Sequence, residues 1–341
     1  MEVPPRRPRK SAASVTVKDV ALQAGVSPMT VSRALNRPGS VDAAMEARVR
    51  QAVEALGYVP NRAARDLRGS RTRLVAAVFP SLGGPIFLQL IESLGHHLSL
   101  LGYQLLVGQS GYRDSREDDL LSDVIARRPD GIVLTGVAHT TMSRRRLEAS
   151  GIPVVETWDL SLDPIGLLVG FSHADAGRAV CDFFCGKARR HLAYVGADDD
   201  RSSKRADAFE RRAAERGVAF QRAQYVPAPA SIGDGRRMLR GLLAAGGRVD
   251  AVFCSSDFVA MGVLIEARQL GLQVPADLMV VGFGDLGIAA DVSPSISSIR
   301  IDTDRIARVS ARWIVDAMSP GARDDRVVDV GFTLVERDST A

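Results

Sequence analysis

The sequence predicts an α/β protein in which a small helical headpiece precedes a body of two doubly wound parallel sheets. Positive charge is concentrated at the N-terminus: residues 1–73 carry 14 Lys and Arg against 6 Asp and Glu, whereas the whole chain has a net charge of only +4. Three short amphipathic helix patterns occupy the first sixty residues. From residue 74 onward, strand-like apolar runs alternate with helix patterns, which is typical of parallel sheets.

The composition indicates a globular protein of the cytoplasm. Of the 341 residues, 46% are hydrophobic and 25% are charged, and no apolar run approaches the roughly 18 residues of a membrane span. The first ten residues are basic, but the apolar stretch of a secretory signal does not follow them. We expect Cys181, Cys185 and Cys254 to be reduced core thiols, and we expect no metal, no cofactor and no membrane contact.

Two helices joined by a tight turn are predicted at the start of the headpiece. Thr16 with an acidic residue three positions later is a helix-start signal, and Gly25 ends this pattern. Ser27 suits the N-cap of a second helix with Pro28 in its first turn, and residues 36–39 stop it. The expected inner faces consist of Val17, Val20, Ala21, Ala24, Val31 and Leu35. A glycine at the centre of so short a connection is typical of a helix-turn-helix unit.

A third helix is predicted between Asp42 and Gly57. Its expected inner face consists of Met45, Val49, Val53 and Leu56. The second helix then exposes short side chains and one arginine, which are Met29, Thr30, Ser32, Arg33 and Asn36. Such side chains suit the base edges of a DNA major groove. A generic three-helix bundle with a polar face would show the same pattern, so the spacing alone leaves both interpretations open.

The strand-like runs of the body show little polar alternation, as expected for sheets that are covered on both faces. The predicted strands are 74–79, 103–107, 131–135, 153–156, 167–171, 192–195, 251–254, 279–283 and 296–301. Helix patterns between them include 86–101, 174–184, 205–216, 235–243, 258–270 and 304–318. This is more than one sheet requires, so we expect two lobes with a ligand cleft at the carboxyl ends of their strands.

The sequence contains no familiar catalytic or nucleotide-binding motif. It has no G-x-G-x-x-G after a strand, no Walker loop, no H-E-x-x-H and no G-x-S-x-G. The glycine-rich run GFGDLG at 282–287 lacks the spacing of a nucleotide loop. We therefore expect a protein that binds ligands and is not an enzyme.

Two stretches of the headpiece, VTVKDVALQAGVSPMTVSRALN (15–36) and ALGYVPNRAARDL (55–67), resemble the lactose-repressor family of transcriptional regulators. In that family the second stretch forms a hinge helix on operator DNA, and its leucine wedges into the minor groove. The resemblance implies a headpiece at 1–60, a hinge helix and linker at 61–73, and a body at 74–341. The DNA-contacting residues that we expect are Val17, Ser27, Pro28, Met29, Thr30, Ser32, Arg33, Asn36, Asn61, Arg62, Arg65 and Leu67.

The body resembles the effector domain of the same family, which is built like a periplasmic sugar-binding protein. Within the family, it is most similar to repressors of gluconate operons. The resemblance rests on stretches such as AVFPSL (77–82), GIPVVE (151–156), LAYVGA (192–197) and DVGFTL (329–334). It implies an N-lobe of about 74–171 plus 303–328 and a C-lobe of about 172–302 plus 329–341.

The resemblance also implies a set of ligand-binding residues. Arg205 stands where the family pattern R-x-x-G-[FW] places an arginine, at the start of a predicted helix, and an arginine fork suits a carboxylate. Further ligand contacts are expected from Ser81, Phe87, His139, Glu156, Trp158, Asp257 and Asp285. Core packing, ion pairing and helix capping are the structural alternatives for Phe87, Glu156 and Asp257. Gly284 and Ser256 replace the Asp and Asn of many family members, which alters the hydroxyl-binding pattern.

Taken with the residues, the resemblance implies a homodimeric repressor on the bacterial nucleoid. It would bind a pseudo-palindromic operator and be released by gluconate or a related aldonate. A corepressor, which strengthens operator binding, is also known in the family. The alternatives of another class are a sugar-binding module without DNA function and an α/β enzyme with an accessory DNA-binding domain. No long heptad pattern follows residue 318, so we expect no coiled-coil tetramerisation segment.

Overall fold

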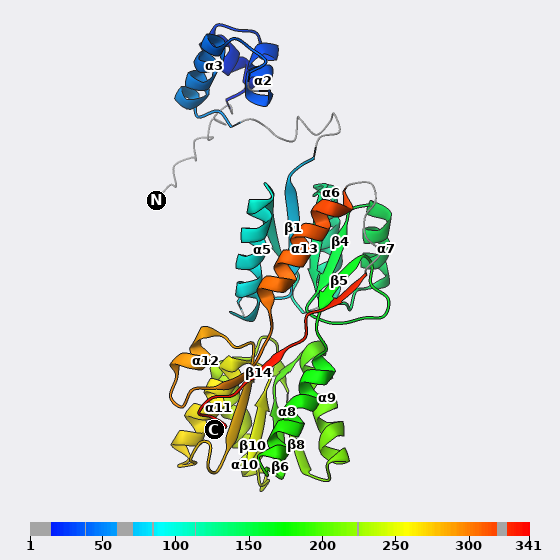
Figure 1. The fold of residues 1–341 in the computed structure, drawn as a ribbon, viewed down its shortest axis with the longest axis vertical. Coiled ribbons are helices and arrows are strands. Elements are labelled where there is room, and N and C mark those ends of the chain that lie inside the picture. The colour runs from blue at the N-terminus through cyan, green and yellow to red at the C-terminus, as the bar shows by residue number, and fades with distance from the viewer. Residues whose placement is uncertain are drawn as a thin grey trace, which may run out of the picture. The chain divides into compact units, whose positions relative to one another are not determined.

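The computed structural model describes residues 15–37, 39–59, 71–83, 85–112, 114–223, 225–318 and 326–341 (Figure 1). The chain forms two compact units, residues 1–72 and 73–341, which are the headpiece and the body. The predicted combination of a helical headpiece and an α/β body is confirmed. Four residues expected to contact DNA, Asn61, Arg62, Arg65 and Leu67, lie outside the described residues. None of the helices within the described ranges is long and apolar enough to cross a membrane.

The headpiece contains three helices whose ends follow the local sequence signals. The helices are α1 (Val17–Ala24), α2 (Pro28–Asn36) and α3 (Ala43–Leu56). The Asp19 carboxylate accepts hydrogen bonds from the backbone N–H and the hydroxyl of Thr16, at 2.8 and 2.7 Å. Ser27 Oγ accepts a hydrogen bond from the backbone N–H of Thr30 at 3.1 Å. Gly25 turns the chain with a φ of 66°, a conformation that glycine adopts without strain.

Small side chains let these three helices approach one another closely. The buried core of the headpiece consists of Val20, Ala21, Ala24, Val31, Ala34, Val49 and Ala52. Met45, which was expected to face inward, is only half-buried, and Ala52 from the same helix is buried instead. Val17 and Leu35 pack against the edge of this core.

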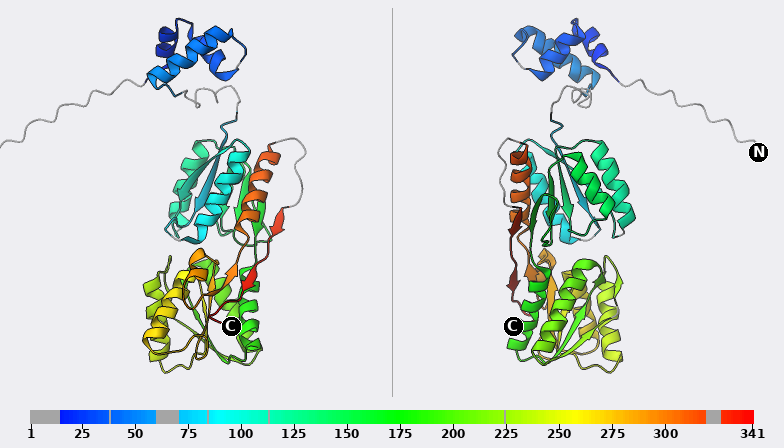
Figure 2. Two further views of the ribbon diagram at one scale, coloured as in Figure 1. Left: turned by 60° about the vertical axis from the view of Figure 1, so that its left-hand side comes forward. Right: turned by 90° about the vertical axis from the view of Figure 1, so that its right-hand side faces the viewer.

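The body has two lobes, each a mainly parallel sheet covered by helices (Figure 2). In the N-lobe the strand order is β13-β5-β4-β3-β1-β2, and all neighbouring strands are parallel. These strands are β1 (Leu74–Phe79), β2 (Gln104–Gln109), β3 (Gly131–Thr135), β4 (Val154–Thr157), β5 (Leu167–Gly170) and β13 (Val327–Asp329). The accompanying helices are η1 (Pro85–Phe87), α5 (Leu88–Leu100), α6 (Asp114–Ala126), α7 (Thr141–Ser150) and α13 (Thr303–Ala317).

The C-lobe sheet has the order β14-β12-β11-β10-β6-β8, and only its edge strand β14 is antiparallel. Its strands are β6 (His191–Val195), β8 (Ala219–Arg222), β10 (Ala251–Cys254), β11 (Met279–Phe283), β12 (Ser297–Arg300) and β14 (Thr333–Val335), with a separate pair β7 (Ala197–Asp198) and β9 (Val226–Pro227). Its helices are α8 (His173–Gly186), α9 (Asp200–Glu215), α10 (Ile232–Ala244), α11 (Asp257–Gln269) and α12 (Gly287–Asp291).

The chain crosses between the lobes three times, after β5, after β12 and after β13. Because β13 and β14 belong to different sheets, the last crossing gives an edge strand to each lobe. The residues after β14 are anchored in the C-lobe. Ser339 Oγ donates a hydrogen bond to the Val280 carbonyl at 2.6 Å and accepts one from the Ser297 N–H at 2.8 Å. Residues 326–341 therefore join the two lobes.

Helix α9 begins five residues before the predicted start at Arg205. Asp199 caps the helix, because its carboxylate accepts hydrogen bonds from the N–H groups of Arg201 and Ser202, each at 3.1 Å. The first turn of α9 is polar, so the apolar periodicity could not reveal it. Arg205 consequently lies in the second turn of the helix. Helices α6 and α7 and the strands β8, β13 and β14 were also not among the predicted elements, since they are charged or short.

Candidate functional site

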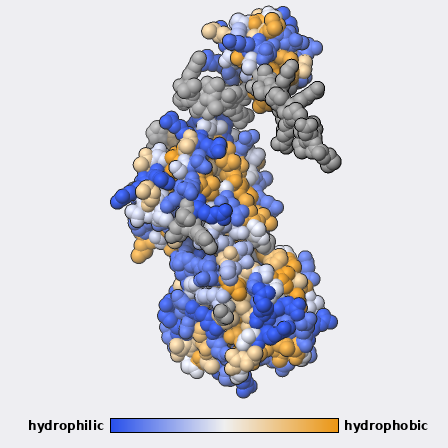
Figure 3. All heavy atoms as spheres, turned by 180° about the vertical axis from the view of Figure 1, so that it is seen from behind, coloured by the Kyte–Doolittle hydropathy of each residue, from blue (hydrophilic) through white to orange (hydrophobic). Residues whose placement is uncertain are grey.

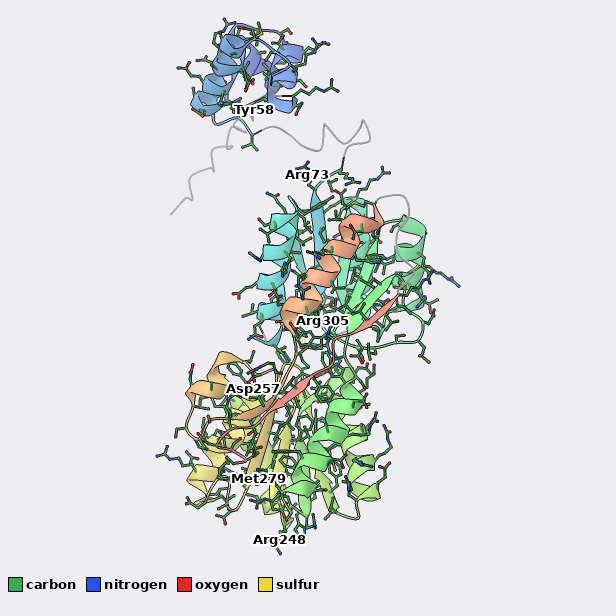
Figure 4. The ribbon with its side chains drawn as sticks, viewed as in Figure 1. Tyr58, Arg73, Arg248, Asp257, Met279 and Arg305 are labelled. Atoms are coloured by element: carbon green, nitrogen blue, oxygen red, sulfur yellow. The ribbon has the colours of Figure 1, made fainter. Side chains whose placement is uncertain are left out.

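The carboxyl ends of the strands in both lobes meet at the lobe boundary (Figure 4). Arg73, directly before β1, lies at the end of the N-lobe that is far from the C-lobe. Met279, where β11 begins, lies toward the opposite end of the body, and Asp257, which follows β10, lies near the boundary. Ligands of doubly wound sheets bind at this edge.

A cavity of about 610 Å³ opens between the two lobes, and its walls are mainly apolar. The N-lobe contributes Ile86, Phe87, Leu88, Tyr112 and Trp158, and the C-lobe contributes Arg201, Arg205, Ser255, Phe258, Phe283 and Leu286 together with residues 228–233. The volume lies within the roughly 300–1,000 Å³ that small-molecule sites occupy. Phe87 and Trp158, both predicted to bind ligand, thus belong to one wall, and Arg205 belongs to the other.

Aromatic rings form a continuous series behind this wall. The Trp158 ring packs edge-on against Phe87 at 5.4 Å and against Phe171 at 5.6 Å between ring centroids. Trp158 has a φ of 74°, a conformation that is costly for a bulky side chain. The backbone at Trp158 is therefore strained where its ring lines the cavity, and such strain is common at binding sites.

Arg205 is buried, being only 4% exposed, although it carries a permanent positive charge. Its Nη1 donates to His173 Nδ1 at 2.9 Å, its Nη2 donates to the Ser255 carbonyl at 3.2 Å, and the guanidinium lies 3.9 Å from the centroid of the Phe283 ring. Its Nε has no hydrogen-bond partner in the described part of the chain. Within the same residues, no carboxylate forms an ion pair with Arg205. The cavity thus contains a buried cation whose counter-ion is not supplied by these residues.

His173 is a site residue that the sequence reasoning missed. It is the first residue of α8 and is 1% exposed. Burial, followed by the charges of Arg205 and Arg201, holds its pKa well below the usual 6.5, so the ring is neutral. The signal that could have revealed it is its position at the start of a helix directly after the carboxyl end of β5.

The structure does not place the other five predicted ligand residues on the lining of this cavity. Ser81 is buried and accepts a hydrogen bond from the Gly83 N–H at 3.2 Å. His139 lies between two carboxylates of the N-lobe, with its Nδ1 2.6 Å from Glu117 Oε1 and its Nε2 3.4 Å from Glu156 Oε1. Burial opposes the charge on His139, but the hydrogen bond with Glu117 and the nearby negative charge of Glu156 raise its pKa to about 9. His139 and Glu156 thus form a charged cluster inside the N-lobe.

Asp257 and Asp285 are also held by contacts within the protein. The buried Asp257 carboxylate accepts hydrogen bonds from the Leu286 N–H at 2.7 Å and from Ser298 Oγ at 2.6 Å. Burial raises the pKa of Asp257 to about 6. The N-cap of α11 is Ser256, so Asp257 braces the C-lobe loops and does not cap the helix. Asp285 pairs with Arg300 at 2.5 Å and with Arg337 at 2.7 Å, on the lining of a different cavity.

Gly284, where many family members carry Asp, leaves little room for a side chain. A Cβ at this position would lie 3.3 Å from Ile86 Cγ1 of the N-lobe, and the φ of 116° favours glycine. The close approach of Ile86 from the N-lobe therefore disfavours a larger side chain at this position. The lobes also meet at an ion pair in which Lys204 Nζ lies 2.6 Å from Asp159 Oδ2.

The headpiece presents α2 with the predicted polar face outward. Ser27, Pro28, Met29, Ser32, Arg33 and Asn36 are exposed, Thr30 is half-buried, and Val17 packs against the core. The described residues 15–59 carry five Lys and Arg against four Asp and Glu. The positive charge of the N-terminal fifth therefore lies mainly before and after this helical unit, in residues 1–14 and 60–73.

Two family models match the chain. Residues 16–61 match the model described as bacterial regulatory proteins, lacI family, and residues 181–340 match a periplasmic binding protein-like domain. The chain is 37% identical to the HTH-type transcriptional regulator GntR of Pseudomonas aeruginosa over 95% of both chains. It is 30% identical to the regulator of the same name from Escherichia coli strain K12, over 93% of this chain and 96% of that protein.

Solved structures agree with these relatives. A lacI-family transcriptional regulator from Silicibacter pomeroyi is 29% identical and matches 96% of this chain and 99% of its own, with a TM-score of 0.89. The lac repressor dimer bound to operator and the anti-inducer ONPF has a TM-score of 0.81 over 96% of this chain and 99% of its own. At 23% identity, this second likeness supports the fold alone.

Proposed function

This chain belongs to the lacI family of DNA-binding transcriptional regulators, and we propose that it is a repressor whose operator affinity is lowered by gluconate or a related aldonate. The effector would bind between the lobes of the body. The headpiece would bind operator DNA, and Met29, Thr30, Ser32, Arg33 and Asn36 of α2 would reach into the major groove. Its site of action would be the nucleoid in the cytoplasm.

The observation that carries the ligand class is the buried Arg205 without a carboxylate counter-ion among the described residues. An unpaired buried charge is costly, so its presence on a cavity wall favours an anionic ligand. The rings of Phe87 and Trp158 suit the C–H faces of a carbon chain, and Ser255 and Ser256 line the same cavity. A small carboxylate with a hydroxylated chain fits these groups.

A homodimer is supported by the surface of the N-lobe. Figure 3 shows hydrophobic residues gathered on one side of the upper lobe of the body. Exposed leucines occur on α5 and on the edge strand β2, and they include Leu88, Leu100 and Leu106. A two-fold dimer would cover this surface and align two headpieces with the half-sites of a palindrome.

The proposal is tested by fluorescence anisotropy with an operator selected from a pool of random duplexes. We expect salt-sensitive binding that gluconate weakens, because Lys and Arg contacts release counterions from the phosphates. Arg33→Ala should lose about 1–3 kcal/mol of specific binding, whereas Arg50→Ala on α3 serves as the matched control. Tighter binding with gluconate would indicate a corepressor, and indifference to gluconate would reject this ligand class.

Tryptophan fluorescence offers a test of the cavity that needs no operator. The chain has two tryptophans, and only Trp158 lines the cavity between the lobes, whereas Trp313 lies on α13 against the N-lobe. We expect gluconate to change the emission of the wild type and of Trp313→Phe but not that of Trp158→Phe. A signal that survives in Trp158→Phe would place the ligand elsewhere.

A further inference from the structure

His173 connects the two lobes directly behind the cavity. It is the first residue of α8, at the point where the chain enters the C-lobe, and its buried side chain packs against the rings of Phe171 and Phe283, which also contact each other. The Phe171 ring lies edge-on at 4.6 Å, and the Phe283 ring lies at 6.0 Å, between centroids. The ring is therefore held in one orientation, and both of its nitrogens have partners.

The partners of the ring fix its protonation state. His173 Nε2 lies 2.9 Å from the backbone carbonyl of Trp158, which can only accept, so Nε2 carries the proton. Nδ1 faces Arg205 Nη1 at 2.9 Å, and a guanidinium can only donate, so Nδ1 must be unprotonated. Both contacts exist together only in the neutral Nε2–H tautomer. A doubly protonated ring would place a second positive charge against the guanidinium.

The electrostatics agree with this geometry. Burial lowers the pKa of His173 most, and the charged groups that lower it further are Arg205, Arg201 and Lys204, all from α9. The hydrogen bond to the Trp158 carbonyl acts in the opposite direction. The neutral tautomer is therefore the form present near neutral pH.

We propose that His173 is the positioning residue of the anion site: its Nδ1 holds the Arg205 guanidinium at the cavity wall, while its Nε2–H anchors that pair to the Trp158 carbonyl of the opposite lobe. Nη1 and Nη2 each use one N–H on His173 and Ser255, so the guanidinium keeps further N–H groups that can donate to a ligand oxygen. Anion binding at Arg205 then depends on the approach of the lobes, because Trp158 belongs to the N-lobe wall. The identity of the anion rests on the proposed function, whereas the contact between His173 and Arg205 is independent of it.

Three substitutions separate the two contacts of the ring. His173→Leu removes both contacts and should weaken gluconate binding about tenfold in calorimetry. His173→Asn places an amide oxygen near the position of Nδ1 and should restore most of the affinity. His173→Gln reaches the Trp158 carbonyl but does not replace the acceptor for Arg205, so it should remain weak. Equal affinities for the Asn and Leu variants would overturn the positioning role.

The dependence of gluconate affinity on pH distinguishes a hydrogen-bonding role of His173 from a role in packing alone. Wild-type affinity should stay level from neutral pH downward and then fall as His173 becomes protonated. The Asn variant should lack this fall, since an amide does not titrate. The same fall in both proteins would assign it to another group and contradict the proposal.

Nitrogen-15 spectra of the ligand-free protein test the pair without any effector. His173→Asn identifies the signal by its loss, and the wild-type ring should be neutral at about pH 6 with its proton on Nε2. In Arg205→Met the pKa of His173 should rise, because the charge that lowers it is removed. A doubly protonated ring at that pH, or an unchanged pKa in Arg205→Met, would reject the pairing. If wild type ignores gluconate but these spectra agree, the ligand assignment fails and the positioning role stands.

Discussion

Replacing Arg205 with Met should lower the affinity for gluconate about a hundredfold, because truncating one partner of a buried charge pair costs about 2–5 kcal/mol. The same change should alter the free energy of unfolding of the ligand-free protein by no more than about 1 kcal/mol, because removal of the uncompensated charge offsets the loss of the hydrogen bonds to His173 and Ser255. The reason is that Arg205 is buried with no carboxylate partner among the described residues, and Met fills similar space beside Phe283 without a charge. Calorimetry and urea unfolding measure the two effects.

A large loss of ligand binding with little change in stability is the mark of a residue kept for its ligand. Arg211→Met is the matched control, since Arg211 is exposed on the same helix α9, and both quantities should stay near wild type. Arg205→Lys keeps the charge but loses the planar fork, so it should bind more weakly than wild type. If Arg205→Met unfolds readily while binding gluconate normally, the arginine is structural and the site lies elsewhere.

His139→Leu should lower the free energy of unfolding by about 3–5 kcal/mol, the usual cost of removing one member of a buried ion pair. Glu156 is 1% exposed and would keep its hydrogen bond from the Ile165 N–H at 2.6 Å while losing its cation. The double variant His139→Leu/Glu156→Gln removes the orphaned charge and should recover a large part of this loss. Urea titrations of His139→Leu, Glu156→Gln and the double variant measure the coupling. Additive losses from the two single variants would show that the pair contributes nothing.

The same cluster predicts how stability depends on alkaline pH. The pKa of His139 is about 9 in the folded protein and 6.5 in the reference state, so the folded state binds its proton more tightly. Its contribution of about 3 kcal/mol is fully present below pH 6.5 and is lost as pH rises through 9. The His139→Leu variant should lack this loss, which thermal unfolding at several pH values would detect.

Local signals in the sequence predicted the headpiece well because its helix ends are decided by neighbouring residues. Ser27, Gly25 and Asp42 each act within four positions of themselves. The strands of both sheets were predictable for a related reason, since strands buried on both faces appear as continuous apolar runs. The family resemblance implied a lobe boundary near residue 328, but local signals could not give the strand pairings there. The edge strand β13 pairs with β5, which lies more than a hundred residues earlier in the chain, and β14 pairs antiparallel with β12.

In the binding site, too, some features could be predicted from the sequence and others depend on contacts between distant residues. The family pattern indicated Arg205, Phe87 and Trp158, which the structure brings to one cavity. It could not reveal that Asp285 pairs with Arg337, which is distant in sequence, or that two glutamates enclose His139. His173 went unnoticed because its importance comes from two contacts in space, one of them to a backbone carbonyl, and its position after β5 is the only trace of them in the sequence.

Residues 326–341, which join the two lobes, affect the order in which the chain folds during synthesis. Each sheet takes one edge strand from this segment, and Ser339 and Thr340 are buried in the C-lobe. Neither lobe can therefore be completed until this stretch has left the ribosome, whereas the headpiece has its whole core within residues 15–59. A nascent chain would present a finished DNA-reading unit well before its sensor exists. A nonsense mutation before residue 326 would produce a chain with a folded DNA-binding headpiece and an incomplete effector-binding body.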